Sequence, residues 1–210
     1  MLYELATLTF LLPDAPLVMR DAEAYVSAAE AGGNLLGAWT TDVGMLGRLL
    51  VLRAFDTADA LAAERERALF HPCPFGQPAA DSGRALAVTA LEMDTYKAFP
   101  FLPAVTPGAY GPIYEIRTYR LKPGGLSPTI AAWEAAVPDR TKRSPLVINM
   151  YAVDGAPRIT HIWPYASASE RFEIRAEAVR AGIWPPKGAP EQVLEASSAL
   201  CLPAPFSPLA

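Results

Sequence analysis

The residue types best suited to chemistry in this chain are a glutamate, an arginine and a histidine in two strand-like segments. Glu115 and Arg117 lie two residues apart in IYEIRTYRL (113–121), and His161 lies in RITHIWPY (158–165). Because side chains alternate between the two faces of a strand, Glu115 and Arg117 share a face. An imidazole near a carboxylate can titrate close to neutral pH and act as a general base. The carboxylate–guanidinium pair could orient an anionic or enolic substrate.

The same alternation collects aromatic rings and an amide on this face. The predicted catalytic residues are His161, Glu115, Arg117 and Tyr151. The predicted ligand-binding residues are Tyr119, Asn149, Trp163, Trp39, Arg53 and Glu4. Structural alternatives stay open: a hydrogen-bonded histidine in a core or interface, an ion pair in a sheet wall, and rings that fill the space between two sheets. A further alternative makes the histidine a haem ligand.

The elements that position these residues occur twice in the chain. The segment YELATLT (3–9) is repeated as YEIRTYR (114–120), and AFPFLP (98–103) has a counterpart in PAPFSP (203–208). A third pair, WTTDVG and YAVDG, falls between them in the same order. Self-similarity at a nearly fixed spacing indicates tandem copies of one structural unit. We therefore predict module one at residues 1–105, a linker at 106–111 and module two at 112–210.

Each module is predicted to form the order strand, helix, strand, strand, helix, strand. The predicted strands span residues 2–10, 34–41, 48–55 and 85–96 in module one and 113–121, 146–153, 158–165 and 192–202 in module two. The predicted helices begin after Asp14, Thr57, Ser127 and Ser167. In the last helix, the predicted buried stripe is Phe172, Ala176 and Val179. A βαββαβ unit is ferredoxin-like, so the predicted fold is α+β.

A ferredoxin-like sheet has one face covered by helices and one bare face. Two such sheets can pack bare face to bare face, which gives an intramolecular barrel. The apolar alternate face is predicted to lie under the helices, and the face bearing Glu115, Arg117 and His161 is predicted to line the barrel. At the positions equivalent to Arg117 and His161, module one has Ala6 and Val51. It is therefore expected to be the degenerate copy, with Glu4, Trp39 and Arg53 reaching the site from across the barrel.

Composition excludes several classes of function. The net charge is −4 and the lysines and arginines are scattered, which argues against nucleic acid as a partner. The apolar runs are short and the N-terminus lacks a basic region, so we expect no membrane insertion, no signal peptide and a cytoplasmic location. Cys73 and Cys201 are expected to be free thiols. His71 and Cys73 in HPCPFG miss the spacing of a metal site, so no metal is expected.

The chain resembles the NIPSNAP family, within the dimeric α/β barrel superfamily. The resemblance rests on YEIRTYRLKPGGL, ITHIWPY and PAPFSPL in module two, and more loosely on YEL, LLGAWTTDVG and AFPFLP in module one. It implies two ferredoxin-like units fused into one barrel. The superfamily includes cofactor-free monooxygenases, haem-binding proteins, isomerases and stress-response proteins, and eukaryotic NIPSNAP members are associated with mitochondrial and vesicular roles. No family catalytic motif could be carried over residue by residue.

The resemblance and the residues together lead to one leading expectation and two alternatives. The leading one is that the barrel binds or transforms a small aromatic or polyketide-like molecule by cofactor-free oxygenation, isomerisation or cyclisation. The alternatives are a non-enzymatic scaffold that uses proline-rich segments such as 184–186, and a haem-binding protein. Whether the chain is an enzyme stays open, and so does its assembly as a monomer or a further homo-oligomer.

Overall fold

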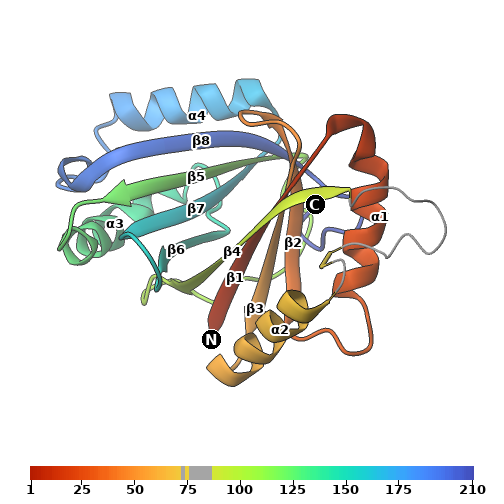
Figure 1. Cartoon of the computed structure of the whole chain (residues 1–210). Helices are drawn as coiled ribbons and strands as arrows, with labels where there is room; N and C mark the ends of the chain where they lie inside the picture. The colour runs from red at the N-terminus through yellow and green to blue at the C-terminus, as the bar shows by residue number, and fades with distance from the viewer. Residues whose placement is uncertain (72–73, 76–86) are drawn as a thin grey trace.

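Eight antiparallel strands close into one barrel. The computed structural model describes residues 1–71, 74–75 and 87–210. The strands are β1 Leu2–Phe10, β2 Asn34–Val43, β3 Arg48–Phe55, β4 Val88–Ala98, β5 Ile113–Leu121, β6 Ile148–Ala152, β7 Arg158–Tyr165 and β8 Val193–Pro203. Their order around the barrel is β1-β3-β2-β8-β5-β7-β6-β4, and β4 pairs with β1 to close it (Figure 1). Each module contributes four neighbouring strands, and closure leaves no sheet edge unpaired.

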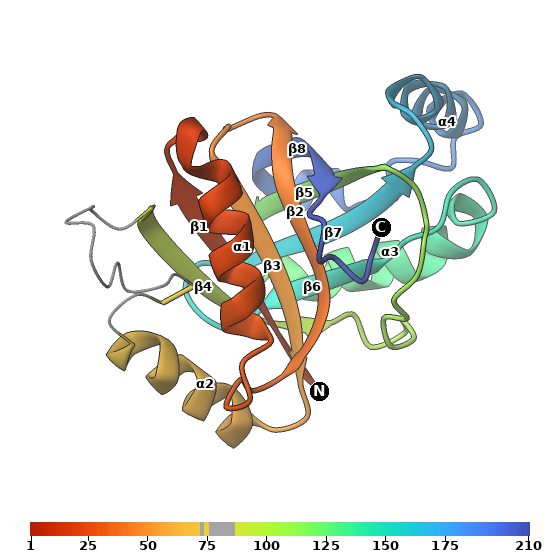
Figure 2. The same cartoon turned by 90° about the vertical axis from the view of Figure 1, so that its right-hand side faces the viewer.

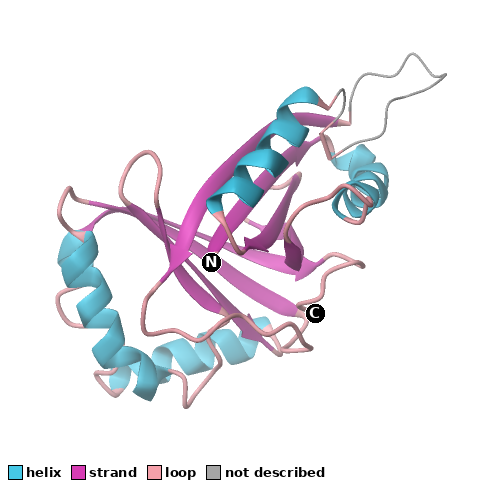
Figure 3. Ribbon diagram, turned by 90° about the horizontal axis from the view of Figure 1, so that it is seen from below, coloured by secondary structure: helices cyan, strands magenta, loops and turns pink. Residues whose placement is uncertain are grey.

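In the described residues, four α-helices pack against the outside of the barrel. They are α1 Ala15–Val26, α2 Ala58–Phe70, α3 Leu126–Arg140 and α4 Ala168–Arg180. The first two lie along the strands of module one, and the other two lie along those of module two (Figures 2 and 3). The predicted α+β fold, with two ferredoxin-like units packed sheet to sheet, is confirmed.

The helix starts are confirmed where a side chain caps the helix. The hydroxyl oxygen of Thr57 accepts a hydrogen bond from the backbone N–H of Ala60 at 3.1 Å, and that of Ser167 accepts one from Glu170 at 3.0 Å. Both are N-cap bonds that satisfy otherwise unpaired backbone donors. The helix predicted to begin after Ser127 starts earlier, at Leu126, with Gly125 at the cap position.

The side chains inside the barrel are mainly apolar, and the interior hydroxyls of Thr118, Thr160 and Tyr96 bond to one another. The prediction about which sheet face turns inward is wrong. The interior cluster combines both modules: Tyr3, Leu5, Trp39, Leu52, Tyr114, Ile116, Met150 and Ile162 are among its members. Glu115, Arg117 and His161 lie on the opposite face, beneath the helices of module two. A small closed barrel has room for side chains alone, so it favours the face without charged groups. The helices supply those partners on the outer face.

Trp39 is the one predicted contributor from module one that does lie inside the barrel. The register of β2 with β3 shifts between Leu35 and Gly37, and this bulge turns Trp39 inward. Its ring is fully buried and lies 5.4 Å from that of Tyr114, centroid to centroid. Glu4 and Arg53 instead lie under α2, on the outer face of module one, so the prediction that they reach the site from across the barrel is wrong.

Replacement of Gly37 by alanine tests how tightly this interior is filled. A Cβ atom at Gly37 would lie 2.2 Å from the buried Trp39 ring. We expect Gly37→Ala to lower the free energy of unfolding by about 1–3 kcal/mol, because overpacking forces a core side chain or the backbone to move. Denaturant unfolding measures the effect. Gly108→Ala is the control, since its new Cβ meets the Tyr110 ring at 3.4 Å. Equal stability for the two variants would show that the interior has spare room.

Helix α4 turns a different face to the sheet from the one predicted. Phe172 and Val179 are 65% and 58% exposed, and Ala176 is exposed as well. The inward positions are Arg171, Ile174, Arg175 and Ala178, which follow the i, i+3, i+4, i+7 spacing of a single helix face. The two arginines point inward because a buried carboxylate on β5 binds them.

Candidate functional site

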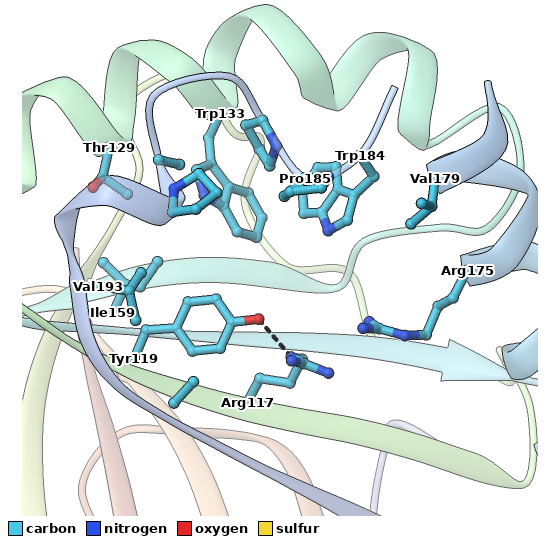
Figure 4. A pocket seen from close by; sticks show the side chains of 14 residues that line it. Arg117, Tyr119, Thr129, Trp133, Ile159, Arg175, Val179, Trp184, Pro185 and Val193 are labelled. Atoms are coloured by element: carbon cyan, nitrogen blue, oxygen red, sulfur yellow. Dashed lines mark hydrogen bonds between the residues drawn. The ribbon is translucent and has the colours of Figure 1, made fainter. Parts of the chain in front are cut away.

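A pocket of about 440 Å³ lies between the module-two sheet and its two helices (Figure 4). Arg117 and Tyr119 of β5 line its sheet side, together with Ile159, Val193 and Ala196. The opposite wall consists of Thr129 and Trp133 of α3, Arg175 and Val179 of α4, and the segment after α4 through Trp184, Pro185, Pro186, Ala189 and Pro190. Its volume is in the range of small-molecule sites.

The predicted site residues form a row across four neighbouring strands. Asn149 on β6 is opposite His161 on β7, which is opposite Arg117 on β5, which is opposite Ser198 on β8. Residues directly opposite each other on paired strands share a face. The sheet therefore brings together Asn149, His161 and Arg117, which the alternation of side chains placed on one strand face. This row of residues lies beneath α3 and α4, next to the pocket.

Glu115 is the anchor of an arginine cluster at one end of the pocket. Its carboxylate is fully buried and accepts hydrogen bonds from Arg117 Nη1 at 2.7 Å, Arg175 Nη1 at 3.4 Å and Arg171 Nη2. The Ser198 hydroxyl donates a further bond at 2.9 Å. Burial acts to raise the pKa of this carboxyl, but the hydrogen bond from Arg171 and the charges of Arg175 and Arg117 lower it to about 2. At neutral pH Glu115 is therefore an anion that holds the three arginines together.

Arg117 and Tyr119 form the polar part of the pocket wall. Arg117 Nε donates a hydrogen bond of 2.7 Å to the Tyr119 hydroxyl oxygen. Figure 4 shows this bond on the sheet side, with Arg175 reaching from α4 toward the same end of the pocket. Trp133, Trp184 and the Tyr119 ring give the rest of the pocket an aromatic lining. The pocket thus has a cationic end and an apolar body.

His161 lies directly behind this wall and is 1% exposed. Its ring centroid is 5.0 Å from that of Tyr119 and 4.8 Å from that of Trp133. Nδ1 accepts a hydrogen bond of 2.8 Å from Trp163 Nε1, so the proton of the neutral ring is on Nε2. Burial, followed by the charge of Arg117, holds the pKa of His161 well below its usual value. The imidazole is neutral at pH 7 and supports the two pocket rings.

Two buried polar side chains in this region have unused hydrogen-bonding atoms. Within the part of the chain that the structure describes, His161 Nε2 and both amide atoms of Asn149 have no hydrogen-bond partner. Unpaired buried groups are rare in folded proteins. On the outer face of β6 and β7, the fold therefore leaves polar groups available beside the pocket.

The remaining predicted residues surround the pocket without lining it. Trp163 packs against Trp133 and Trp184, and the Arg140 guanidinium carbon lies 4.5 Å from its ring centroid. Tyr151 lies beside Phe99, at 6.5 Å between centroids. Neither ring is in the pocket lining, so we place both in the supporting core.

Four contributors to this site were missed in the sequence: Arg171, Arg175, Trp133 and Trp184. Trp184 belongs to the proline-rich segment 184–186, which the scaffold alternative uses. The predicted face of α4 is wrong because Phe172 and Val179 are hydrophobic, whereas two of the four inward residues are arginines. The i, i+3, i+4, i+7 pattern of Arg171, Ile174, Arg175 and Ala178 is the signal that could have found it.

The other chemistry-bearing groups lie away from the pocket. Cys201 is a free, fully buried thiol, and burial raises its pKa to about 11. Cys73 lies outside the described residues. The centroid of the His71 ring lies 5.5 Å from that of the Tyr25 ring.

In the described ranges, no group of three or more potential metal ligands (His, Cys, Asp or Glu) comes together. None of the helices in the described part of the chain has the length and apolar character needed to cross a membrane.

The barrel of two ferredoxin-like units, with a pocket under the helices of one of them, defines a protein of the dimeric α/β barrel class. An anthrone oxidase-like protein of known structure matches 96% of this chain and 90% of its own at a TM-score of 0.66, with 12% identity. A Lactobacillus acidophilus protein described as a candidate monooxygenase matches 97% and 93% at a TM-score of 0.64, with 13% identity. At these identities the likeness shows the fold.

Sequence comparison gives the family. The NIPSNAP family model matches residues 3–103 and 114–208. A NipSnap homolog from Dictyostelium discoideum is 26% identical over 187 residues, which cover 87% of this chain and 77% of that protein. The chain belongs to the NIPSNAP family, as the resemblance of its motifs indicated.

Proposed function

We propose that this NIPSNAP protein binds a small organic molecule in the pocket between the module-two sheet, α3 and α4. The observation that supports the proposal most directly is the pocket itself, which combines about 440 Å³ of space with aromatic walls and a cationic end. Pockets with an apolar lining and a few convergent polar groups are the usual small-molecule sites of proteins. The barrel interior, in contrast, is occupied by an apolar cluster of side chains from both modules.

The residue roles in this proposal follow from position. Arg117 and Tyr119 contact the ligand, because their side chains line the pocket. His161 positions the Tyr119 and Trp133 rings from behind. Glu115 holds the arginines in place. Tyr151 has no direct contact with the ligand, because it packs on Phe99.

We further propose that the ligand is aromatic or polyketide-like and is transformed without a cofactor, by oxygenation, isomerisation or cyclisation. The pocket rings suit a flat aromatic body, which can stack on Trp133, Trp184 or Tyr119. The names of the two structural neighbours, one an anthrone oxidase-like protein and one a candidate monooxygenase, point in the same direction.

Haem ligation by His161 does not fit the geometry. Nδ1 already accepts the Trp163 hydrogen bond, and the ring is fully enclosed between Tyr119 and Trp133. Ligation of haem iron needs an accessible ring nitrogen with its lone pair free.

The scaffold alternative has weaker support than the small-molecule proposal. Pro186 is buried, and the segment 184–186 forms a wall of the pocket.

A pocket-filling variant tests the binding proposal. Ala196 is an exposed strand residue that lines the pocket opposite Tyr119, so Ala196→Trp places an indole in the space at little cost to the fold. We expect the wild-type protein to bind the neutral fluorescent probe N-phenyl-1-naphthylamine and the variant to lose at least about tenfold in affinity. Fluorescence titration measures both. Ala90→Trp, at an exposed position on β4 of module one, is the matched control and should bind like the wild type. Equal binding by all three proteins would overturn the proposal.

The oxygenase form of the proposal has its own test. Anthrone plus O₂ gives anthraquinone plus water, with the substrate carbon oxidised and O₂ reduced, so no added cofactor is needed. We expect oxygen uptake and anthraquinone formation with the purified protein, and loss of both in Ala196→Trp. Probe binding without oxygen uptake would leave the binding site standing and reject oxygenation of this substrate.

A further inference from the structure

We propose that the ligand of this pocket is an acidic aromatic molecule, whose carboxylate, enolate or phenolate binds between Arg117 and Arg175 while its flat apolar body lies among the rings. This inference rests on the proposed function, since it names the chemical class that the same pocket would take. Figure 4 shows the two guanidinium groups at one end of the pocket and the rings of Trp133, Trp184 and Tyr119 along the rest of it.

The charges around the pocket do not balance. Arg117, Arg171 and Arg175 all bind one carboxylate, that of Glu115. In the described part of the chain, no other carboxylate forms an ion pair with any of these three arginines. The side chains of Arg117 and Arg171 are 15% and 12% exposed, so water can screen them only in part. Positive charge held in a partly desolvated space is stabilised by a bound anion.

Arg140 adds a fourth cation to the same region. It is 2% exposed, and its guanidinium stacks on Trp163 and Trp184, the second of which lines the pocket. Its hydrogen bonds go to the neutral hydroxyls of Ser144 at 2.7 Å and Tyr165 at 3.2 Å. The excess is local, because the chain as a whole has a net charge of −4.

Module one shows what normally neutralises such a cluster. Arg65 of α2 binds Glu4 of β1 at 3.0 Å, as Arg175 of α4 binds Glu115 of β5. The residue before Arg65 is Glu64, a second buried carboxylate that pairs with Arg53 and Arg67. The residue before Arg175 is Ile174.

Module two thus has one buried carboxylate for its three arginines, whereas module one has two, Glu4 and Glu64, for Arg53, Arg65 and Arg67. Where module one carries Ala6 and Leu8 in an apolar cluster, module two carries Arg117 and Tyr119 beside a pocket. A ligand that brings its own negative charge would supply what Glu64 supplies in module one. Guanidinium groups suit this task because they stay charged and can bind a carboxylate through two parallel hydrogen bonds.

A pair of probes that differ only in charge tests the inference. 8-Anilino-1-naphthalenesulfonate has the ring system of N-phenyl-1-naphthylamine plus one sulfonate, so the ratio of their affinities isolates the effect of the anion. We expect the wild-type protein to bind the anionic probe at least about tenfold more tightly than the neutral one. Probe binding measured with the Ala196→Trp variant, in which the pocket is filled, gives the binding to other surfaces, and this signal is subtracted.

Substitutions of Arg175 and of its module-one equivalent Arg65 test whether the preference for the anionic probe depends on the pocket arginine. Arg175→Gln should lower affinity for the anionic probe by about tenfold and leave affinity for the neutral probe unchanged. Arg175→Lys, which keeps the charge, should retain most of the preference. Arg65→Gln is the control, because Arg65 has the same place in module one and the same kind of partner, a buried glutamate. Circular dichroism melting checks that each variant is folded.

The outcomes separate the two proposals. Tighter binding of the anionic probe that depends on Arg175 and not on Arg65 supports the inference. Equal or tighter binding of the neutral probe in the pocket overturns the inference and leaves the proposed function intact. If Ala196→Trp affects neither probe, the pocket is not a binding site, and both proposals fail.

Discussion

Replacing Glu115 with glutamine is expected to lower the free energy of unfolding at pH 7 by about 3–5 kcal/mol. The carboxylate is fully buried and is the common acceptor for three arginines, so its removal leaves several partly buried cations without a counter-charge. Urea or guanidinium unfolding measures the loss. Glu195→Gln is the control, because that residue is 71% exposed and its pair with Arg120 is 3.8 Å long. The control should change stability by less than about 1 kcal/mol.

Glu115 should also make the free energy of unfolding depend on pH in the acidic range. The pKa of this carboxyl is lowered from 4.5 to about 2 in the folded protein, so the folded state holds its proton less tightly than the unfolded chain does. Its contribution is present above the unfolded value and is lost as the pH falls from about 5 toward 2, with a total of about 3 kcal/mol. The Glu115→Gln variant should lack this component. A variant that loses stability with acid as steeply as the wild type would contradict the assignment.

Replacing Trp39 with alanine is expected to cost about 3–5 kcal/mol of stability and to leave probe binding within about a factor of two of the wild type. The side chain is fully buried in the barrel interior, where it packs on Tyr114, and the pocket lies on the other side of the sheet. A cavity in the core therefore destabilises the fold without opening or closing the site. Denaturant unfolding and probe titration give the two values.

Trp184→Ala provides the contrast with Trp39→Ala. This indole is half-buried, lines the pocket and packs edge-on against Trp133 at 4.7 Å between centroids. We expect a smaller loss of stability and about a tenfold loss of probe affinity, because the stacking surface is removed. If Trp39→Ala weakened probe binding more than Trp184→Ala, the ligand would be in the barrel interior, as the sequence had suggested.

The arrangement of elements could be predicted closely because its signals are local. Strands β5 and β7 begin and end where alternation and flanking turns placed them, at Ile113–Leu121 and Arg158–Tyr165. Thr57 and Ser167 cap their helices as expected, since a cap bond involves residues only three apart. The repeat supplied the order of the elements, and the bare face of each ferredoxin-like sheet indicated that the two sheets would pack on one another.

The membership of the site was predictable in part. Arg117 and Tyr119 are in the pocket wall, and His161 is in contact with it, as grouping by strand face implied. The arginines of α4 were not predictable as partners, because Arg171 and Arg175 are 56 and 60 residues from Glu115 along the chain. Only the packing of the helix on the sheet shows that they share a carboxylate.

The sequence by itself determined the two faces of strands β5 and β7, the duplication and the family. Alternation separates Tyr114 and Ile116 from Glu115 and Arg117 whatever surrounds them. Only the tertiary structure decided which face would be enclosed. Closure of the barrel selected the apolar face, because an ion pair inside would have lost its water without gaining the arginines of α4. That choice moved the candidate site from the centre of the barrel to the pocket beneath its helices.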